Sequence, residues 1–475
     1  MIPPEIIRDV QYQIQERVIL SNRRLVVAIT VSLLLASGCA DKPAPVHVTE
    51  RPTETVTVID GAQVWDGTGL PPTQDAVLVM RGSRIEAVGP RGALRIPENA
   101  LVIDAQGRTA IPGLINSHGH VGMTKGLRQG KENYTRQNIL DQLRQYARYG
   151  VTTVMSLGTD FEPIFEVRGA ARLDEPARAR VYTAGRGFAG KQAFPAVLPG
   201  NAGLAREVGT AAEVSKHVEE LADQKVDAVK VWVDDHWGHY SKIPLDLCEA
   251  IIKESHARNL TVMAHVFYLE DARKLVQAGL DGMAHSVRDK AVDEAFIKLV
   301  LERGVFVVPT LTREESTYLY AKPPAFLDDP FFGKWVNPEI IAELKDPAWG
   351  RKVSSDPEFH RYPGQLKTAQ KNLKKVFDAG VKIAFGTDSG PPARFQGYFE
   401  HRELELMVQA GLTPSQALQT ATGNAAACLK LKEVGRLEAG KQADIVLLDG
   451  DPLEDIVQTR QISRVWVAGR EVDLR

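Results

Sequence analysis

The chain has 475 residues and a formal net charge of −2; 44% of its residues are hydrophobic and 25% are charged. This composition is typical of a globular protein with one large domain and an addition, or with two to three domains. The near-neutral charge gives no electrostatic case for a nucleic-acid partner. Three cysteines are too few for a disulfide framework.

The N-terminal segment 1–39 predicts export. An apolar run, 25–36, follows two arginines and is too short for a comfortable bilayer span, but it suits the core of a signal peptide. Ala36-Ser37-Gly38-Cys39 resembles a bacterial lipoprotein box, although leucine is commoner where Ala36 stands. We expect a periplasmic or outer-surface protein that meets the membrane only through a lipid on Cys39. The alternative is an uncleaved anchor helix. Prolines among polar residues predict a tether over 40–54.

Both ends of the remaining chain have the pattern of short β-strands. Alternating or apolar runs separated by glycines occupy 55–60, 76–80, 84–88 and 101–104. The same pattern returns only near the C-terminus, at 443–448 and 465–469. Short strands at this spacing predict a small antiparallel sheet. We therefore expect one composite β-sandwich domain, built from 55–112 and 433–475, with a larger domain inserted between the two parts.

The middle of the chain, 113–432, predicts an α/β fold of the TIM-barrel type. Helix-like segments repeatedly end in Gly or Asn and an apolar strand follows, which is typical of βα units and a parallel sheet. Eight strands in this region fit a (β/α)8 barrel, with a long loop and helical excursion over 312–365. An open doubly wound sheet ranks second, because no glycine-rich phosphate loop follows the first strand. The predicted strands are 114–118, 151–157, 180–184, 228–233, 261–265, 281–285, 305–310 and 381–387.

Polar residues stand at matched places in five of these strands. The first strand ends in His118 and His120, which point to the same side because strand residues two apart share a face. In such a barrel the active site lies at the carboxyl ends of the strands. Burying these groups together without a metal would leave polar atoms and a lysine charge without partners. The pattern therefore predicts a metal site, and its members are His118, His120, Lys230, His265, His285 and Asp388.

This set resembles the amidohydrolase superfamily, whose members have His-x-His on strand one, lysine or glutamate on strand four, histidines on strands five and six, and aspartate on strand eight. The segments 112–118 and 435–444 are similar to the superfamily's entry and exit signatures. The resemblance covers 55–475 and is closest to imidazolonepropionase-related hydrolases, including prolidase-like peptidases. True imidazolonepropionases are mononuclear and lack the lysine bridge, so Lys230 argues against that activity.

The resemblance implies a binuclear site and a hydrolytic mechanism. It implies that carbon dioxide carboxylates Lys230, which then bridges two divalent metals; zinc suits these ligands, with manganese or cobalt as alternatives. His118, His120 and Asp388 would hold the first metal, and His265 and His285 the second. A metal-bridging hydroxide would attack a carbonyl, and Asp388 would act as the general acid and base.

Candidate substrate-binding residues follow the strand ends: an arginine could pair a substrate carboxylate, and Tyr240 or His239 could steady an oxyanion. His401 opens a helix with Glu403 and Glu405, and this group is interpreted as part of a solvated helix face, with support of the metal-site residues from behind as the alternative. The candidates for substrate binding are Arg186, His239, Tyr240, Arg288 and Tyr398, with His236, Trp237 and Arg394 in the same loops.

The sequence thus predicts an exported metal hydrolase that cleaves the amide bond of a dipeptide or an N-acyl amino acid. One alternative is a lactonase or organophosphate-ester hydrolase on the same two metals. An alternative of another class is a non-catalytic metal-binding lipoprotein. The expected partners are a small substrate and, as an open possibility, a second copy of the chain.

Overall fold

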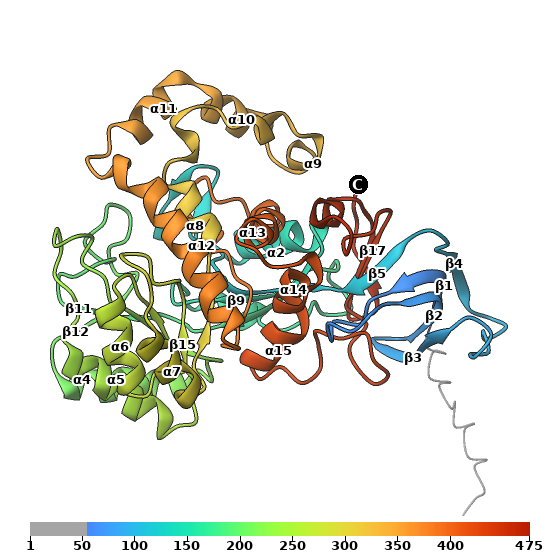
Figure 1. Cartoon of the computed structure of the whole chain (residues 1–475), viewed down its shortest axis with the longest axis horizontal. Helices are drawn as coiled ribbons and strands as arrows, with labels where there is room; N and C mark the ends of the chain where they lie inside the picture. The colour runs from blue at the N-terminus through green and yellow to red at the C-terminus, as the bar shows by residue number, and fades with distance from the viewer. Residues whose placement is uncertain (1–54) are drawn as a thin grey trace, which may run out of the picture. The chain divides into compact units, whose positions relative to one another are not determined.

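The computed structural model describes residues 55–475 (Figure 1). The predicted signal segment, Cys39 and the tether lie outside the described residues. Within 55–475, none of the helices combines the length and the apolar character that a membrane crossing needs. The free thiols of this region belong to Cys248, which is buried, and Cys428, which is partly buried.

The two ends of the described chain build one eight-stranded sheet in the order β19-β18-β17-β5-β1-β2-β3, with β4 also paired to β1. The C-terminal strands join the N-terminal ones through the antiparallel pair β17 and β5. The strands are β1 (Val56–Val64), β2 (Thr73–Arg81), β3 (Arg84–Pro90), β4 (Leu101–Asp104), β5 (Thr109–Pro112), β17 (Ile445–Leu448), β18 (Ile462–Val467) and β19 (Arg470–Glu471).

The sheet bends so that its two halves share one core. Ile59 and Leu78 from the first half pack in the same cluster as Ile445 and Trp466 from the second. Strand β1 pairs with β4 before Gly61 and with β5 after it, and Gly61 has the positive φ of 83° that the irregularity requires. The domain composed from both termini is therefore present in the fold.

The inserted region is the expected (β/α)8 barrel. Its strands run in chain order around the barrel, and the pairs between them are parallel. β10 and β13 meet through the hydrogen bond from the Asp227 amide to the Thr183 carbonyl, 2.8 Å. The first seven strands are β6 (Leu114–Gly119), β9 (Val151–Ser156), β10 (Arg180–Thr183), β13 (Val229–Trp232), β14 (Val262–His265), β15 (Gly282–Met283) and β16 (Phe306–Val307).

The eighth barrel position is occupied by an extended segment, 381–389, that closes the ring by short contacts. Ile383 bridges to Val307 of β16, and Ser389 bridges to Gly119 of β6. The Ser117 amide donates to the Phe385 carbonyl at 2.8 Å. Closure by this segment places its carboxyl end beside the end of β6.

Helices cover the outside of the barrel, and several have clear sequence boundaries. α7 begins after Asp293, whose carboxylate accepts from the Phe296 amide at 2.8 Å, and it ends at Gly304 with a φ of 65°. The principal helices are α2 (Arg136–Arg148), α3 (Pro163–Val167), α4 (Ala211–Asp223), α5 (Leu245–His256), α6 (Leu269–Gln277), α7 (Glu294–Arg303), α12 (Tyr362–Asp378), α13 (Tyr398–Gln409), α14 (Pro414–Gln419) and α15 (Ala425–Cys428).

The excursion after β16 is helical, as predicted. It contains α8 (Leu311–Ser316), α9 (Pro330–Gly333), α10 (Pro338–Lys345) and α11 (Pro347–Ser354), and Figure 1 shows the last three lying away from the barrel strands. Proline at the first turn and an Asp or Asn cap start α9, α10 and α11. An aromatic cluster that includes Phe332, Tyr398 and Tyr149 anchors this excursion to the barrel.

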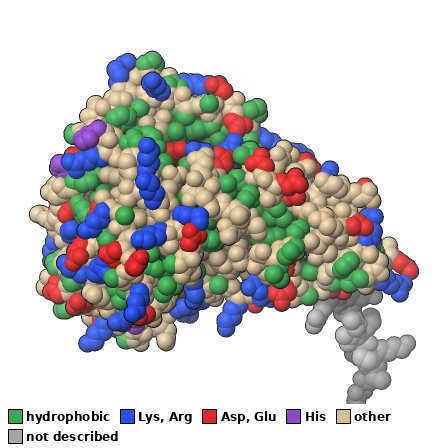
Figure 2. Space-filling model, viewed as in Figure 1, with side chains coloured by type: hydrophobic (Ala, Val, Ile, Leu, Met, Phe, Trp, Pro, Cys, Tyr) green, Lys and Arg blue, Asp and Glu red, His purple; other side chains and the backbone are tan. Residues whose placement is uncertain are grey.

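The surface charge agrees with the composition. On the face that Figure 2 shows, Lys and Arg side chains lie intermixed with Asp and Glu side chains. This visible face offers no continuous basic surface of the kind that binds a phosphate backbone.

The interpretation of His401 as part of a solvated face is wrong. α13 is packed between the barrel and the C-terminal segment, so His401 is 1% exposed and Glu403 is fully buried. His401 contacts the Tyr149 carbonyl through Nε2 and the Thr459 hydroxyl through Nδ1, both at 2.9 Å. Burial lowers the pKa of His401 to about 3.

This pKa predicts an acid-dependent loss of stability. The unfolded state binds a proton at His401 below about pH 6.5, whereas the folded state does so only near pH 3. The contribution of neutral His401 to the free energy of unfolding is therefore complete above pH 6.5 and is lost as the pH falls toward 3. We expect His401→Gln to flatten the dependence of the unfolding free energy on pH by up to about 1.4 kcal/mol per pH unit in this window. Urea titrations of the wild type and of His401→Gln between pH 4 and 7 measure the free energy of unfolding at each pH. The same pH dependence in both proteins would contradict the prediction.

Candidate active site

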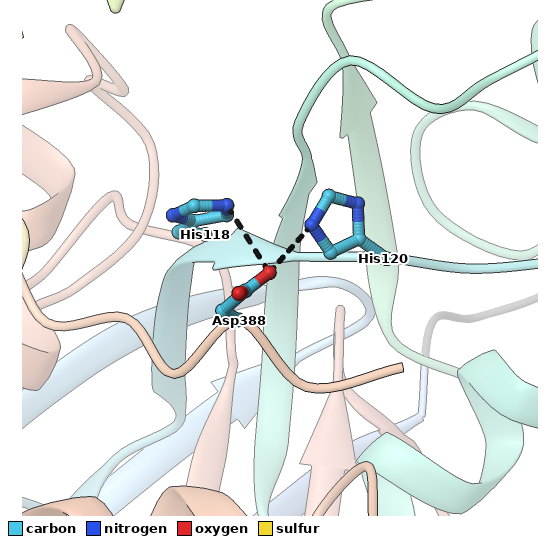
Figure 3. Close-up of side chains that lie close together, drawn as sticks. All are labelled: His118, His120 and Asp388. Atoms are coloured by element: carbon cyan, nitrogen blue, oxygen red, sulfur yellow. Dashed lines mark hydrogen bonds and ion pairs between the residues drawn. The ribbon is translucent and has the colours of Figure 1, made fainter. Parts of the chain in front are cut away.

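Two histidines of β6 and one aspartate of the closing segment meet at the mouth of the barrel. The Nε2 atom of His120 lies 2.8 Å from Oδ1 of Asp388, and Nε2 of His118 lies 3.5 Å from the same oxygen (Figure 3). The donor atoms of the three residues lie within 4.8 Å of one another, and all three side chains are buried. Such a group of imidazoles and a carboxylate is suited to one divalent metal.

Asp388 is held in place by a strained backbone and by an arginine. Its φ of 57° is unusual for a residue with a side chain. Its amide donates to the His118 carbonyl at 2.7 Å, and its Oδ2 accepts from Arg394 at 2.6 Å. Burial alone would raise the pKa of Asp388, but Arg394 and the two histidines hold it well below its usual range. The carboxylate is therefore ionised.

A buried carboxyl group ties the closing segment to β6. Glu400 is fully buried, and its Oε1 accepts from Asn116 at 2.6 Å, Thr387 at 2.8 Å and Ser389 at 2.6 Å. Asn116 in turn accepts from the His118 amide at 2.9 Å. One carboxyl group thus fixes the strand with the histidines and the segment with the aspartate at the same time.

The other two histidines lie next to this group. The rings of His118 and His285 are 4.8 Å apart, and those of His285 and His265 are 4.3 Å apart. Burial lowers the pKa of His265 to about 3, and it lowers the pKa of His118 and of His285 well below 6.5. The three rings are therefore neutral, which is the form that binds metals.

Each histidine is oriented by a hydrogen bond to one ring nitrogen, and the other nitrogen of each is directed away from that partner; in His120 it contacts Asp388. His118 Nδ1 lies 2.7 Å from the Ala284 carbonyl. His265 uses its Nε2 instead, 2.9 Å from the buried carboxylate of Asp234. Two hydroxyls orient the remaining rings: Thr159 is 2.9 Å from His120 Nδ1, and Thr310 is 2.7 Å from His285 Nδ1.

Lys230 lies inside the barrel among these residues. Its side chain is fully buried and its Nζ has no hydrogen-bond partner in the described chain. Burial lowers the pKa of Lys230 to about 7, so a large fraction of the amine is neutral. A Cβ at Gly158 would stand 2.7 Å from Lys230 Cγ, and one at Gly187 would stand 2.9 Å from its Cβ. The lysine stem thus occupies space that only glycines leave open, and its orphaned nitrogen fits a ligated or modified state.

A cavity of about 240 Å³ opens above the histidines and Asp388. One wall is apolar and includes Phe194, Leu198, Leu204 and Trp232. His236, Arg313 and Arg394 supply polar groups. A space of this size fits a small molecule with one apolar portion.

The five predicted substrate-binding residues do not line this cavity. Arg288 is fully buried and pairs with Glu314 at 2.8 Å. His239 is exposed and contacts Glu358, Tyr240 is 37% exposed, and Tyr398 stacks on Phe326 in the aromatic cluster. Arg186 lines a separate cavity. Their side chains lie outside the cavity lining, so the cavity gives them no support as substrate residues, whereas His236 and Arg394 from the same loops do line it. Trp237 packs against Phe267 outside the cavity lining.

Sequence reasoning missed the residues that orient the histidines, and it missed Arg313. Asp234 and Thr159 stand just past strand ends, where a polar residue could have been noticed. Arg313 lies in α8, at the start of the segment for which the sequence predicts a long loop and helical excursion. No sequence signal pairs Thr310 with His285, because that contact depends on the barrel's closure.

A model of the amidohydrolase family matches residues 109–472. The chain belongs to the amidohydrolase family. As a member, the protein is a metal-binding hydrolase that acts on C–N bonds. The prediction made from the five strand ends is confirmed at this level.

Relatives of this family member span almost its whole length. It is 24% identical to an imidazolonepropionase of Streptomyces griseus over 423 residues, which are 87% of this chain and 97% of the relative. It is 23% identical to an ochratoxinase of Aspergillus niger over 466 residues, 90% and 88% of the two chains. Among solved structures, it resembles a Xaa-Pro dipeptidase with bound methionine in the active site, with a TM-score of 0.69 and 22% identity over 88% of this chain and 99% of the other. These likenesses confirm the barrel with its additional domain.

The close packing of Gly158 on the Lys230 stem leads to a prediction about the metal content of a variant. In Gly158→Ala the new methyl group would overlap the lysine stem, so Lys230 must move and we expect a clear loss of bound metal. Gly169→Ala is the matched control, because Gly169 also has a positive φ, 79°, but a Cβ there meets no atom within 4 Å. Both variants should lose about 1 kcal/mol of stability from backbone strain. Elemental analysis of the dialysed proteins measures the metal, and equal contents would contradict the prediction.

Proposed function

We propose that this amidohydrolase uses two divalent metal ions, zinc being the metal that the donors suit best, to hydrolyse the amide bond of a dipeptide or an N-acyl amino acid. The observation that supports this most is the convergence of four oriented histidines and an ionised aspartate at the floor of one small cavity, with a buried lysine whose charge acts on His118 and His265. Two cationic side chains and an apolar wall line the same cavity.

His118, His120 and Asp388 would hold one metal, and His265 and His285 the other. Lys230 would bridge the two after its neutral amine reacts with carbon dioxide: the nitrogen bonds to the carbon, one proton leaves, and a carbamate anion remains. The low pKa of Lys230 favours this reaction, because only the neutral amine reacts. When bound, the metals supply a water activated for attack and polarise the scissile carbonyl.

Asp388 is the general base and acid in this proposal. Its carboxylate is ionised, because Arg394 donates to one oxygen. The other oxygen faces His118 and His120, the residues that would hold a metal together with Asp388. From there it can accept a proton and return it to the leaving amine.

The cavity's charge supports a substrate with a carboxylate next to the scissile bond. Arg313 and Arg394 line the cavity. Each uses its Nη1 on a carboxylate of the protein, Glu314 and Asp388 respectively, and the Nη2 group of each remains for a substrate carboxylate. Phe194, Leu198 and Trp232 offer an apolar surface to a side chain or acyl group. Dipeptides and N-acyl amino acids have both features, and the named relatives, a dipeptidase structure and an ochratoxinase, are compatible with this class.

The direct test is a panel of dipeptides, N-acyl amino acids, lactones and phosphotriesters, assayed before and after chelation. We expect turnover of the amides that a chelator abolishes and added zinc restores. Turnover of lactones or phosphotriesters alone would establish the ester-hydrolase alternative. A protein that binds metal and turns over no member would support the non-catalytic alternative.

The role of Asp388 predicts a specific variant phenotype. Asp388→Asn keeps the size and one oxygen but cannot accept the proton, so we expect kcat to fall by about 10²–10⁴ while metal remains bound. Asp235→Asn is the control, since Asp235 is an acid near strand β13 that contacts Tyr268 and Lys242 outside the cavity. Steady-state kinetics with metal analysis measures both, and unaltered turnover in Asp388→Asn would refute the assignment.

Arg313 predicts selectivity for a free carboxylate. In Arg313→Gln we expect kcat/KM for an N-acyl amino acid to fall by about 10–100-fold, the value of a charged hydrogen bond. The corresponding primary amide, which lacks the charge, should be turned over as by the wild type. An equal loss on both compounds would show that Arg313 supports the fold or the metals instead.

A further inference from the structure

A second cavity, of about 380 Å³, lies beside the active site and shares no lining residue with it. Two hydrogen-bonded loops separate the two spaces: Thr159 bridges to Arg186, and the Asp160 amide donates to the Gly185 carbonyl at 3.1 Å. Thr159 faces the catalytic cavity, whereas Asp160 and Arg186 line the second one. The second cavity is therefore a distinct space on the same rim of the barrel.

Arg186 stands in this cavity without an anionic partner. It forms no ion pair with any carboxylate of residues 55–475, and its Nη2 donates only to the Ala205 carbonyl at 3.0 Å. Its Nε is buried and has no acceptor. A second arginine, Arg206, is 9% exposed, and its Nε likewise has no acceptor, although its Nη1 pairs with Glu220. Two partly unsatisfied guanidinium groups side by side are unfavourable unless an anion compensates them.

The carboxylates at this cavity already have other donors. Asp160 accepts hydrogen bonds from Tyr134 at 2.9 Å, Ser156 at 2.6 Å and Thr183 at 2.5 Å. Glu162 accepts from Gln224 at 2.9 Å. Neither carboxylate reaches Arg186 within ion-pair distance, so the protein itself does not supply the missing anion.

An aromatic ring lies at the centre of the cluster of cations. The Nζ of Lys131 is 4.9 Å from the centroid of Phe161, and the guanidinium carbon of Arg186 is 5.6 Å from it. Phe161, Pro163 and Phe165 all line the cavity. The site therefore combines positive charge with an apolar surface.

We propose that this cavity is a second binding site, which takes a compact ligand bearing a carboxylate or phosphate group on Arg186, Lys131 and Arg206, with an apolar portion against Phe161. The fork of a guanidinium matches either oxyanion. This inference does not depend on the substrate proposed above. The ligand would contact the loop whose Thr159 orients His120, so the site is placed to act on the catalytic centre.

The test uses the full-length, metal-loaded protein and two probes, inorganic phosphate and phenyl phosphate, in calorimetric titrations. Phosphate can also bind at metals, so the site is defined by the difference between wild type and Arg186→Gln. We expect one binding event to weaken at least tenfold in Arg186→Gln and to weaken also in Lys131→Gln, where an exposed side chain is changed and folding is not at risk. Arg258→Gln is the matched control, a half-buried arginine paired with Glu254 outside the cavity. Tighter binding of phenyl phosphate than of phosphate would support the role of Phe161.

A crystal grown with selenate locates the anion directly by anomalous scattering. A peak between Arg186 and Lys131 supports the proposal. Identical titrations for wild type, Arg186→Gln and Lys131→Gln, or a selenate peak only beside Asp388, would overturn it. A higher KM in Arg186→Gln with unchanged phosphate binding would also overturn it, because Arg186 would then belong to the substrate path.

Discussion

The structure depends on the burial of one lysine, Lys230, whose amine has no hydrogen-bond partner among residues 55–475. Lys230 lies inside the barrel, where an ammonium group cannot keep its water and where neighbouring imidazoles offer no negative charge. The chain accommodates it by removing bulk: Gly158 and Gly187, on the loops after β9 and β10, leave the space that its stem fills. A buried amine is costly to fold, and buried groups with shifted pKa values cluster at functional sites.

The closing segment of the barrel converts this pocket into a site. It has little regular strand structure, yet it delivers Asp388 to the histidines of β6 through backbone bonds and through the carboxyl group of Glu400. The left-handed backbone of Asp388 is strain that this scaffold holds in place. The loop that follows this segment presents Arg394, which keeps the Asp388 carboxylate ionised. The position and the charge of Asp388 therefore both depend on this part of the chain.

Two cavities lie on the rim of the barrel, and we propose that one serves chemistry and the other recognition. The catalytic cavity contains the four histidines and Asp388. The neighbouring cavity contains Lys131, Arg186 and Arg206 beside an aromatic ring. Only the pair of loops at Thr159 and Arg186 lies between them. A barrel whose strands are fixed can vary such loops independently.

The sequence by itself determined the barrel and the composite sheet, and it predicted a six-residue metal site, of which the structure brings the four histidines and Asp388 together. Strand residues alternate with period two and parallel strands end at one face, so a residue's type and its place at a strand end suffice to predict which side chains meet. The substrate residues could not be predicted in this way. Tyr398 and Arg288 follow strand ends as Arg394 does, yet they are buried elsewhere, because a loop's path depends on the packing of segments distant in sequence. Arg313 reaches the cavity for the same reason: the tertiary structure alone decides where a long side chain on an irregular segment points.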